Sequence, residues 1–136
     1  SINLYPSLCY FEGTKISAGR GTKMQFQIFG SPHLPKEQFS FTFTPQPNEG
    51  AKNPKFNAKL CFGKDLSKID KLNYINLDWL IEAYNSSTDK VNFFNNFMPK
   101  LAGTKKMQQQ IENGMVSEEI RKTWQEDIKK FKTISF

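Results

Sequence analysis

The first half of the chain alternates short apolar segments with polar loops. Residues 5–12 predict a short helix, because Leu8 and Phe11 lie on one face at helical spacing. Gly13 follows as a natural stop. Glu12 then lies at the C-terminal end of the helix, where the macrodipole disfavours a negative charge. This unfavourable placement indicates that the acid has another role.

Three later segments have the period-2 alternation of β-strands, namely residues 25–29, 39–44 and 59–62. The clearest is 39–44, in which three phenylalanines face one side and three hydroxyl side chains face the other. We expect the first strand to end in a turn over residues 30–33 and the third to stop at Gly63.

The second half of the chain is predicted to be helical. Asn76, Thr104 and Ser117 are suitable N-cap residues, and each precedes apolar residues at helical spacing. In order, these residues are Leu77, Leu80, Ile81 and Tyr84; Met107 and Ile111; and Ile120, Trp124, Ile128 and Phe131. Strands followed by helices predict an α+β fold, with a small mixed or antiparallel sheet packed with several helices and a mainly helical C-terminal half.

Size and composition are those of one globular domain over residues 1–136. The 13 phenylalanines favour a packed interior over a disordered tail. A net charge of +6 permits binding to anionic partners, but the lysines are scattered and a nucleic-acid-binding arm is not indicated. The chain contains no apolar run that could span a membrane and no signal peptide, and both of its ends look like cuts in a longer protein.

The cysteines and the single histidine do not indicate a metal site. Cys9 and Cys61 lie far apart and lack the spacing of zinc ligands. A disulfide between them is open, but two separate buried thiols are the simpler expectation, and we predict that they are unbridged. With His33 as the one histidine, a His-rich metal site within this chain is excluded. We assign no metal and no cofactor.

The most unusual segment is residues 11–22, with three glycines, three hydroxyl side chains, Glu12 and Arg20. Glycine permits close approach of the backbone to a ligand, and Arg20 between two glycines has room to point into a cleft. Most clusters of this composition are only turns, so a polar surface loop is the default interpretation. Glycoside hydrolysis usually needs two carboxylates, and Glu12 is the only acid in a site-like loop. The chain alone therefore displays no complete active site.

Several motifs resemble a known family. In the N-terminal part they are Tyr5-Pro6-Ser7-Leu8-Cys9, Phe11-Glu12-Gly13-Thr14, Ser17-x-Gly19-Arg20-Gly21-Thr22 and Gln27-x-x-Gly30-Ser31-Pro32. Downstream they are Phe43-Thr44-Pro45, Cys61-x-Gly63, Leu101-Ala102-Gly103-Thr104, Gln110-Ile111 and Glu119-Ile120-Arg121-x-x-Trp124-Gln125. Together they resemble, over nearly the whole chain, the C-terminal part of the NamZ-type exo-β-N-acetylmuramidases, formerly a domain of unknown function.

The resemblance implies a two-domain enzyme with a Rossmann-like N-terminal domain, absent from this chain, and an active site in the cleft between the domains. Such enzymes remove N-acetylmuramic acid from the non-reducing end of peptidoglycan fragments. The main catalytic carboxylate would belong to the N-terminal domain, and this chain would supply the opposite wall. We therefore expect a periplasmic or secreted enzyme, no nucleic-acid partner, and no activity from residues 1–136 alone.

The sequence departs from the family pattern at a few points. His33 stands where an aromatic residue, usually tryptophan, is expected after Gly-Ser-Pro, and Lys64 replaces an apolar residue after Gly63. The chain also stops short of the expected end, which is rich in tyrosine and leucine. The change at His33 concerns the details of sugar contact.

The candidate substrate-binding residues are Glu12, Ser17, Arg20, Thr22 and His33. Arg20 is a suitable partner for the lactyl carboxylate of muramic acid, although it could equally bond to loop carbonyls. Glu12 could bind sugar hydroxyls, assist the catalytic acid or orient Arg20. We predict that the two side chains pair, because Gly19 and Gly21 let the loop fold back and a nearby cation stabilises the carboxylate.

Two other functions remain as alternatives to the hydrolase domain. A non-catalytic carbohydrate-binding or cell-wall-binding module would bind sugars without turnover. A nucleic-acid-binding module is suggested by the charge and the aromatic content, but the phenylalanines lie at core spacing. Steep salt-dependent retention on DNA would favour it.

Overall fold

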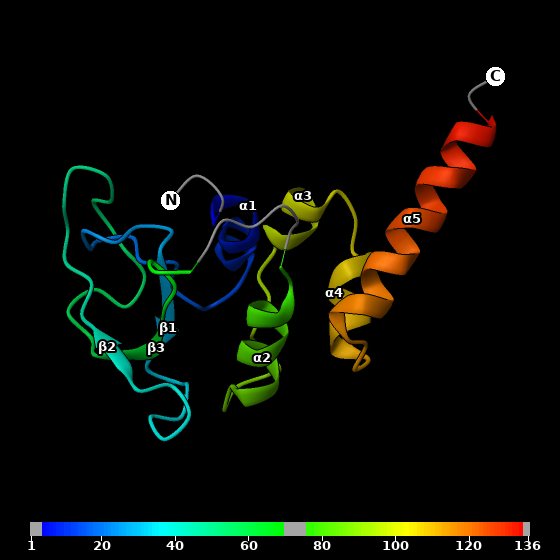
Figure 1. Ribbon diagram of the computed structural model, residues 1–136. Coiled ribbons are helices and arrows are strands. Elements are labelled where there is room, and N and C mark those ends of the chain that lie inside the picture. The colour runs from blue at the N-terminus through cyan, green and yellow to red at the C-terminus, as the bar shows by residue number, and fades with distance from the viewer. Residues whose placement is uncertain (1–3, 70–75, 135–136) are drawn as a thin grey trace.

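The computed structural model describes residues 4–69 and 76–134 and contains one small sheet and several helices (Figure 1). In chain order the elements are α1 (Tyr5–Leu8), the 3-10 helix η1 (Cys9–Gly13), β1 (Ile28–Ser31), β2 (Phe41–Phe43), β3 (Cys61–Asp65), α2 (Asp78–Ser86), α3 (Met98–Ala102), α4 (Lys106–Glu112) and α5 (Ser117–Ile134). The predicted α+β class and the mainly helical C-terminal half are confirmed.

The sheet is antiparallel throughout, with the strand order β1-β3-β2. The predicted end of the third strand at Gly63 is wrong, because Gly63 pairs with Gly30 of β1 on one side and with Phe41 of β2 on the other. A Cβ atom built at Gly63 would lie 1.7 Å from the carbonyl oxygen of Phe29. Glycine therefore allows the close approach of two strands here and does not end the strand.

The bounds predicted for the first strand, residues 25–29, are also wrong. Phe26 has a positive φ of 58° and lies in a turn, whereas Gly30 and Ser31, which we expected in a turn, belong to β1. The N–H of Ser17 donates to the oxygen of Gly30 over 2.8 Å, and the N–H of Gly30 donates back over 3.0 Å. This pairing with a distant loop keeps residue 30 extended, and local alternation does not reveal it.

The second predicted strand is real but shorter than residues 39–44. β2 covers only its centre, and the alternation of faces is as expected. Phe39 is fully buried and Phe41 and Phe43 are partly buried, while the intervening hydroxyl side chains are exposed.

Residues 5–12 are helical as predicted, in two consecutive pieces. α1 is a single α-helical turn, and η1 continues it as a 3-10 helix through Gly13. η1 ends before Thr14, because the backbone of Thr14 is extended, with φ of −135° and ψ of 177°. The N–H and the hydroxyl of Thr14 both donate to the oxygen of Phe11, over 3.0 and 2.8 Å. Glu12 thus lies in the last turn of this helical segment, as the sequence predicts.

The predicted N-caps are displaced by one residue: the N-caps of α2 and α4 are Leu77 and Lys105, and Ser117 is already helical. The side-chain oxygen of Asn76 accepts from the first N–H of α2 over 2.8 Å, and Thr104 does the same for α4 over 3.2 Å. α5 begins at Ser117 itself. α3 was not predicted, although Pro99 in its first turn and Gly103 after its end, with φ of 78°, are typical boundaries.

The predicted stripes of the C-terminal helices face the interior. The buried members are Leu77, Leu80, Met107, Ile111 and Ile120, and the partly buried ones are Ile81, Tyr84 and Trp124. The side chains of Ile128 and Phe131 lie outside the described part of α5. No described helix is long and apolar enough to cross a membrane.

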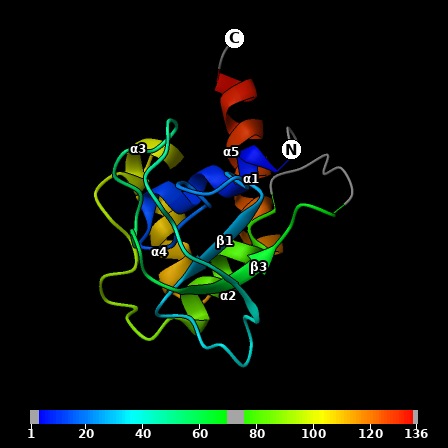
Figure 2. The same cartoon turned by 90° about the vertical axis from the view of Figure 1, so that its left-hand side faces the viewer.

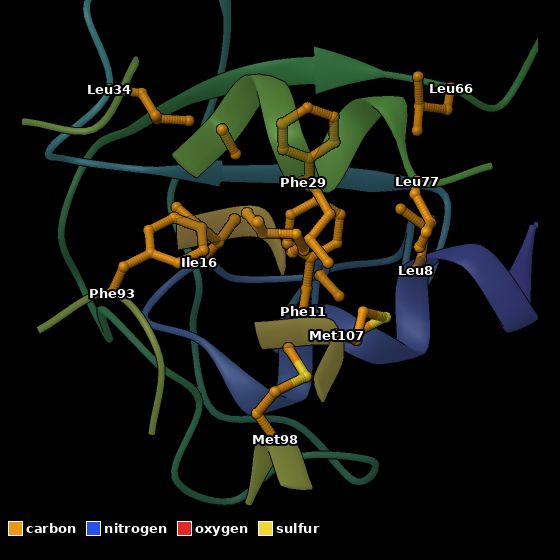
Figure 3. Packing of buried hydrophobic residues seen from close by; sticks show 14 of the residues in the cluster. Leu8, Phe11, Ile16, Phe29, Leu34, Leu66, Leu77, Phe93, Met98 and Met107 are labelled. Carbon is orange, nitrogen blue, oxygen red and sulfur yellow. The ribbon is translucent and has the colours of Figure 1, made fainter. Parts of the chain in front are cut away.

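One apolar cluster joins the sheet to the helices (Figure 3). Phe11 of η1 stacks on Phe29 of β1 with ring centroids 4.8 Å apart, and Phe39 meets Phe29 edge-on at 6.1 Å. Met98 of α3 and Met107 of α4 reach the same cluster. Stacked aromatic rings contribute stability beyond that of the apolar area they bury. The stacking therefore anchors η1, from which the following loop begins, to the sheet.

The sheet occupies one end of the molecule and α4 and α5 the other, with α1 and η1 between them (Figure 1). Figure 2, in which the sheet end faces the viewer, shows α5 projecting beyond the rest of the molecule. η1 therefore stands at the centre of the chain's packing, and the loop after it runs along the sheet.

Candidate functional site

Glu12 forms an ion pair with Arg20, as the sequence predicts. The Nε–H of Arg20 donates to Oε1 of Glu12, and the Nζ of Lys55 lies 3.8 Å from Oε2. The Glu12 side chain is 18% exposed and that of Arg20 is 40% exposed. The carboxylate is therefore largely enclosed, while part of the guanidinium reaches the surface.

The glycines on either side of Arg20 produce the turn that brings it back to Glu12. Gly19 and Gly21 have φ of 88° and 83°, values that other residues adopt only at a cost. A Cβ atom at Gly19 would also lie 2.7 Å from the carbonyl oxygen of Met24. This local requirement accounts for the Gly-Arg-Gly sequence.

The ring of Phe26 packs against the guanidinium of Arg20. The guanidinium carbon lies 5.1 Å from the ring centroid, within the range of a cation–π interaction, and the ring of Tyr5 meets Phe26 edge-on at 4.7 Å. The backbone of Phe26 has φ of 58°, which is uncommon for a bulky residue. Strain of this kind is concentrated at functional sites.

Lys55 comes from a distant loop and binds the backbone around Glu12. Its ammonium donates to the oxygens of Phe11, Thr14 and Ile16 over 2.9, 2.7 and 3.2 Å. Burial lowers the pKa of Lys55 to about 8, while Glu12 acts to raise that pKa and Arg20 to lower it. The ammonium is therefore mostly charged at pH 7.

A pocket of about 450 Å³ opens beside this cluster. It is lined by Thr14, Lys15, His33, Lys55, Phe56 and Asn95. The Nδ2–H of Asn95 donates to the backbone oxygen of Glu12 over 3.2 Å, so the pocket and the ion pair share a wall. This volume lies within the range of small-molecule sites, and its lining combines an aromatic face with convergent polar groups.

His33, a predicted site residue, lies at this pocket and not next to Arg20. Its exposed ring meets Phe56 edge-on with centroids 6.0 Å apart. Phe56 has φ of 55°, a second strained aromatic residue in this region. The structure thus brings Glu12, Arg20 and His33 to two adjoining parts of one surface.

The hydroxyls of Ser17 and Thr22 are engaged in hydrogen bonds with the backbone of their own loop. Ser17 is 2% exposed, and its Oγ accepts from the N–H of Gly19 over 3.1 Å. The hydroxyl of Thr22 donates to the oxygen of Gly19 over 2.7 Å and accepts from the N–H of Met24 over 3.0 Å. Both hydroxyls hold the turn around Arg20, so we leave them out of the site proposed below.

Sequence reasoning missed Lys55, Phe56 and Asn95. Lys55 and Phe56 lie in a loop rich in glycine, proline, asparagine and lysine over residues 48–57, and Asn95 lies in a separate segment with neither glycine nor proline. Neither segment has periodicity, and nothing in them distinguishes these three residues from solvated ones. For Lys55 and Phe56 the available signal was the cluster of turn-forming residues over 48–57, which indicates a long loop but not what the loop contacts.

The site is suited to binding an anionic, hydroxylated ligand. Its cations are Arg20, Lys15 and Lys55, and its carboxylate is Glu12. The pocket lining contains no carboxylate, so the two-acid arrangement of a glycosidase needs an acid from elsewhere. Within the described residues, no group of three or more histidine, cysteine or acidic side chains could hold a metal ion.

Comparison with known proteins identifies the family. The family model described as "Exo-beta-N-acetylmuramidase NamZ, C-terminal" matches residues 3–135. A crystal structure of a DUF1343 family protein from Bacteroides fragilis superposes with a TM-score of 0.88 at 41% sequence identity. The match covers 97% of this chain but only 38% of that one, and no curated protein matches significantly. The chain therefore belongs to the family of NamZ C-terminal domains.

Proposed function

We propose that this chain is the C-terminal, cleft-forming domain of a secreted or periplasmic glycoside hydrolase that releases N-acetylmuramic acid from non-reducing ends of peptidoglycan fragments. The observation that supports this best is the Glu12–Arg20 ion pair beside a pocket of about 450 Å³, within a domain of the NamZ C-terminal family. This domain forms one wall of the active-site cleft.

Arg20 receives the lactyl carboxylate in this proposal. Glu12 occupies the Nε edge of the guanidinium, and the side chain remains 40% exposed, so its outer N–H groups are accessible. A guanidinium matches a carboxylate with two parallel hydrogen bonds. Glu12 holds the guanidinium in that orientation and is placed to accept hydrogen bonds from sugar hydroxyls.

The adjoining pocket accommodates the rest of the sugar. Phe56 and His33 offer ring faces, and Asn95 offers a side-chain amide for the hydroxyl or N-acetyl groups. Lys15 and Lys55 make the pocket electropositive, which favours an acidic sugar over its neutral counterpart.

The catalytic carboxylate is contributed by the N-terminal domain of the full-length protein. The described pocket has no acid of its own, and the chain spans about 38% of the related crystallised protein. Glu12 then assists from the opposite wall, because its carboxylate is bound to Arg20 and lies close to Lys55 of the pocket lining.

The test is product analysis with the full-length protein on peptidoglycan fragments that begin with N-acetylmuramic acid. Release of free N-acetylmuramic acid from the non-reducing end, detected by mass spectrometry, supports the proposal. Fragments that begin with N-acetylglucosamine serve as the matched control and should remain intact. Tight binding of the fragments without any release would refute the hydrolase and favour a carbohydrate-binding module.

A further inference from the structure

The ammonium of Lys55 occupies a cage built from a single short stretch of backbone. Its three oxygen ligands belong to Phe11, Thr14 and Ile16, which lie 39 to 44 positions away in the sequence. A lysine ammonium has three N–H donors, so three carbonyl oxygens use its full hydrogen-bonding capacity. Lys55 is therefore not free to bind substrate through the same donors.

The three carbonyl groups converge because η1 ends there. Glu12 lies between the first two of them, in the last turn of η1, and its side chain points back toward the same ammonium, with Oε2 at 3.8 Å from Nζ. Convergent carbonyl oxygens repel one another unless a donor or cation lies among them. Lys55 supplies that cation from the loop that also carries Phe56.

The arrangement connects the backbone of the site with the pocket. Lys55 lines the pocket, and its side chain is 32% exposed. Burial lowers the pKa of Lys55 to about 8, and the carbonyl ligands favour the charged form that they bind. Through these contacts the ammonium connects residues 11–16 with the loop that carries Phe56.

We propose that Lys55 is a positioning residue whose ammonium fixes the backbone of residues 11–16 and thereby directs Glu12 and Arg20 toward the substrate pocket. The expected effect of Lys55 on catalysis rests on the proposed function. Its expected effect on the backbone of residues 11–16 rests only on the three hydrogen bonds to carbonyl oxygens. The chain offers a matched control in Lys64, whose Nζ forms an ion pair with Glu82 over 2.7 Å.

The first arm of the experiment is activity and its chemical rescue in the full-length protein. Lys55→Ala should lower kcat about 100-fold, since a displacement of about 1 Å in a catalytic group has that effect, with a smaller change in KM. The substitution leaves room for n-propylammonium, which can enter through the pocket. Added n-propylammonium should raise the kcat of Lys55→Ala at least tenfold. Tetramethylammonium has no N–H donor and should restore nothing. Lys64→Ala should stay within about twofold of the wild type.

The second arm does not depend on activity. Lys55→Met keeps the apolar stem of the side chain but removes the donors. Hydrogen exchange of the backbone N–H groups of Lys15, Ser17 and Gly19, which are all hydrogen-bonded in this loop, should become about tenfold faster, while the amides of α4 keep the wild-type rate.

The outcomes separate the two proposals. No release of N-acetylmuramic acid by the wild type refutes the proposed function, and the exchange rates then decide the inference about Lys55. Unchanged loop exchange in Lys55→Met, unchanged kcat in Lys55→Ala, or a loss of kcat that n-propylammonium does not restore each overturns the positioning role. Faster exchange in α4 as well would mean that the whole domain is destabilised, and would also overturn it.

Discussion

Replacing Arg20 by alanine should weaken the binding of muramyl ligands far more than it weakens the fold. The loss in the free energy of unfolding should be small, because Arg20 is 40% exposed and a partly exposed ion pair contributes about 0.2–1 kcal/mol. Lys55 also remains 3.8 Å from Glu12 and keeps a cation near the carboxylate. The melting temperature should therefore fall by only a few degrees.

The loss in the free energy of ligand binding should be larger than the loss in the free energy of unfolding. Arg20→Ala removes a charge-assisted hydrogen bond to the lactyl carboxylate, worth about 1.5–3 kcal/mol. That loss corresponds to a dissociation constant raised about 10- to 150-fold. Arg20→Lys keeps the charge but loses the two-pronged guanidinium contact, so its affinity should lie between those of alanine and the wild type.

The assay is calorimetric titration of the full-length protein with N-acetylmuramic acid and with N-acetylglucosamine, which lacks the lactyl group. Arg20→Ala should reduce the preference for the first sugar and leave the affinity for the second nearly unchanged. Lys64→Ala, which breaks the ion pair with Glu82, is the control and should alter neither. An equal loss of affinity for both sugars, or no loss for either, would show that Arg20 does not bind the lactyl carboxylate.

Further predictions concern the isolated chain and its cysteines. Residues 1–136 alone should fold but should not hydrolyse a chromogenic N-acetylmuramic acid glycoside, and measurable turnover by the purified fragment would contradict this. Both Cys9 and Cys61 are free in the structure, so thiol counting in denaturant should find two thiols in the monomer. Burial raises the pKa of Cys61 to about 12, so iodoacetamide at pH 8.5 should leave Cys61 unmodified until the protein is unfolded. Because the folded chain keeps this proton to a higher pH than the unfolded chain, Cys61 should lower the free energy of unfolding as pH rises from about 9 toward 12; a Cys61→Ala variant should lack that part of the pH dependence.

The parts of the fold that the sequence predicts best depend on local chemistry. The hydrogen bonds that Asn76 and Thr104 make to the first N–H of α2 and α4, and the apolar stripe of α2, are properties of nearby residues, although each predicted cap lies one residue before the N-cap of the structure. The bounds of β1 and β3 depend on pairing between distant strands. Alternation alone could not show that Gly30 and Gly63 lie inside strands, where they pair with each other.

The candidate site also contains a part that depends on local sequence and a part that depends on distant contacts. The Glu12–Arg20 pair could be predicted, because both residues belong to one glycine-rich segment and the poor placement of the acid calls for a cation. Lys55 and Asn95 could not, since each arrives from a loop with no periodic pattern and bonds to backbone oxygens. Backbone acceptors exist at every residue, so the sequence does not show which of them a distant lysine will reach.

The central claim is that Glu12 serves catalysis from this wall of the cleft, and the turnover of full-length Glu12→Gln tests it most directly. Glu82→Gln is the matched control, because Glu82 is also ion-paired to a cation, Lys64, but lies away from the pocket lining. The account predicts that Glu12→Gln lowers kcat on muramyl substrates while its melting temperature stays within a few degrees of the wild type, and that Glu82→Gln keeps the wild-type kcat. Full activity of Glu12→Gln would contradict the account and leave residues 11–22 as a structural loop.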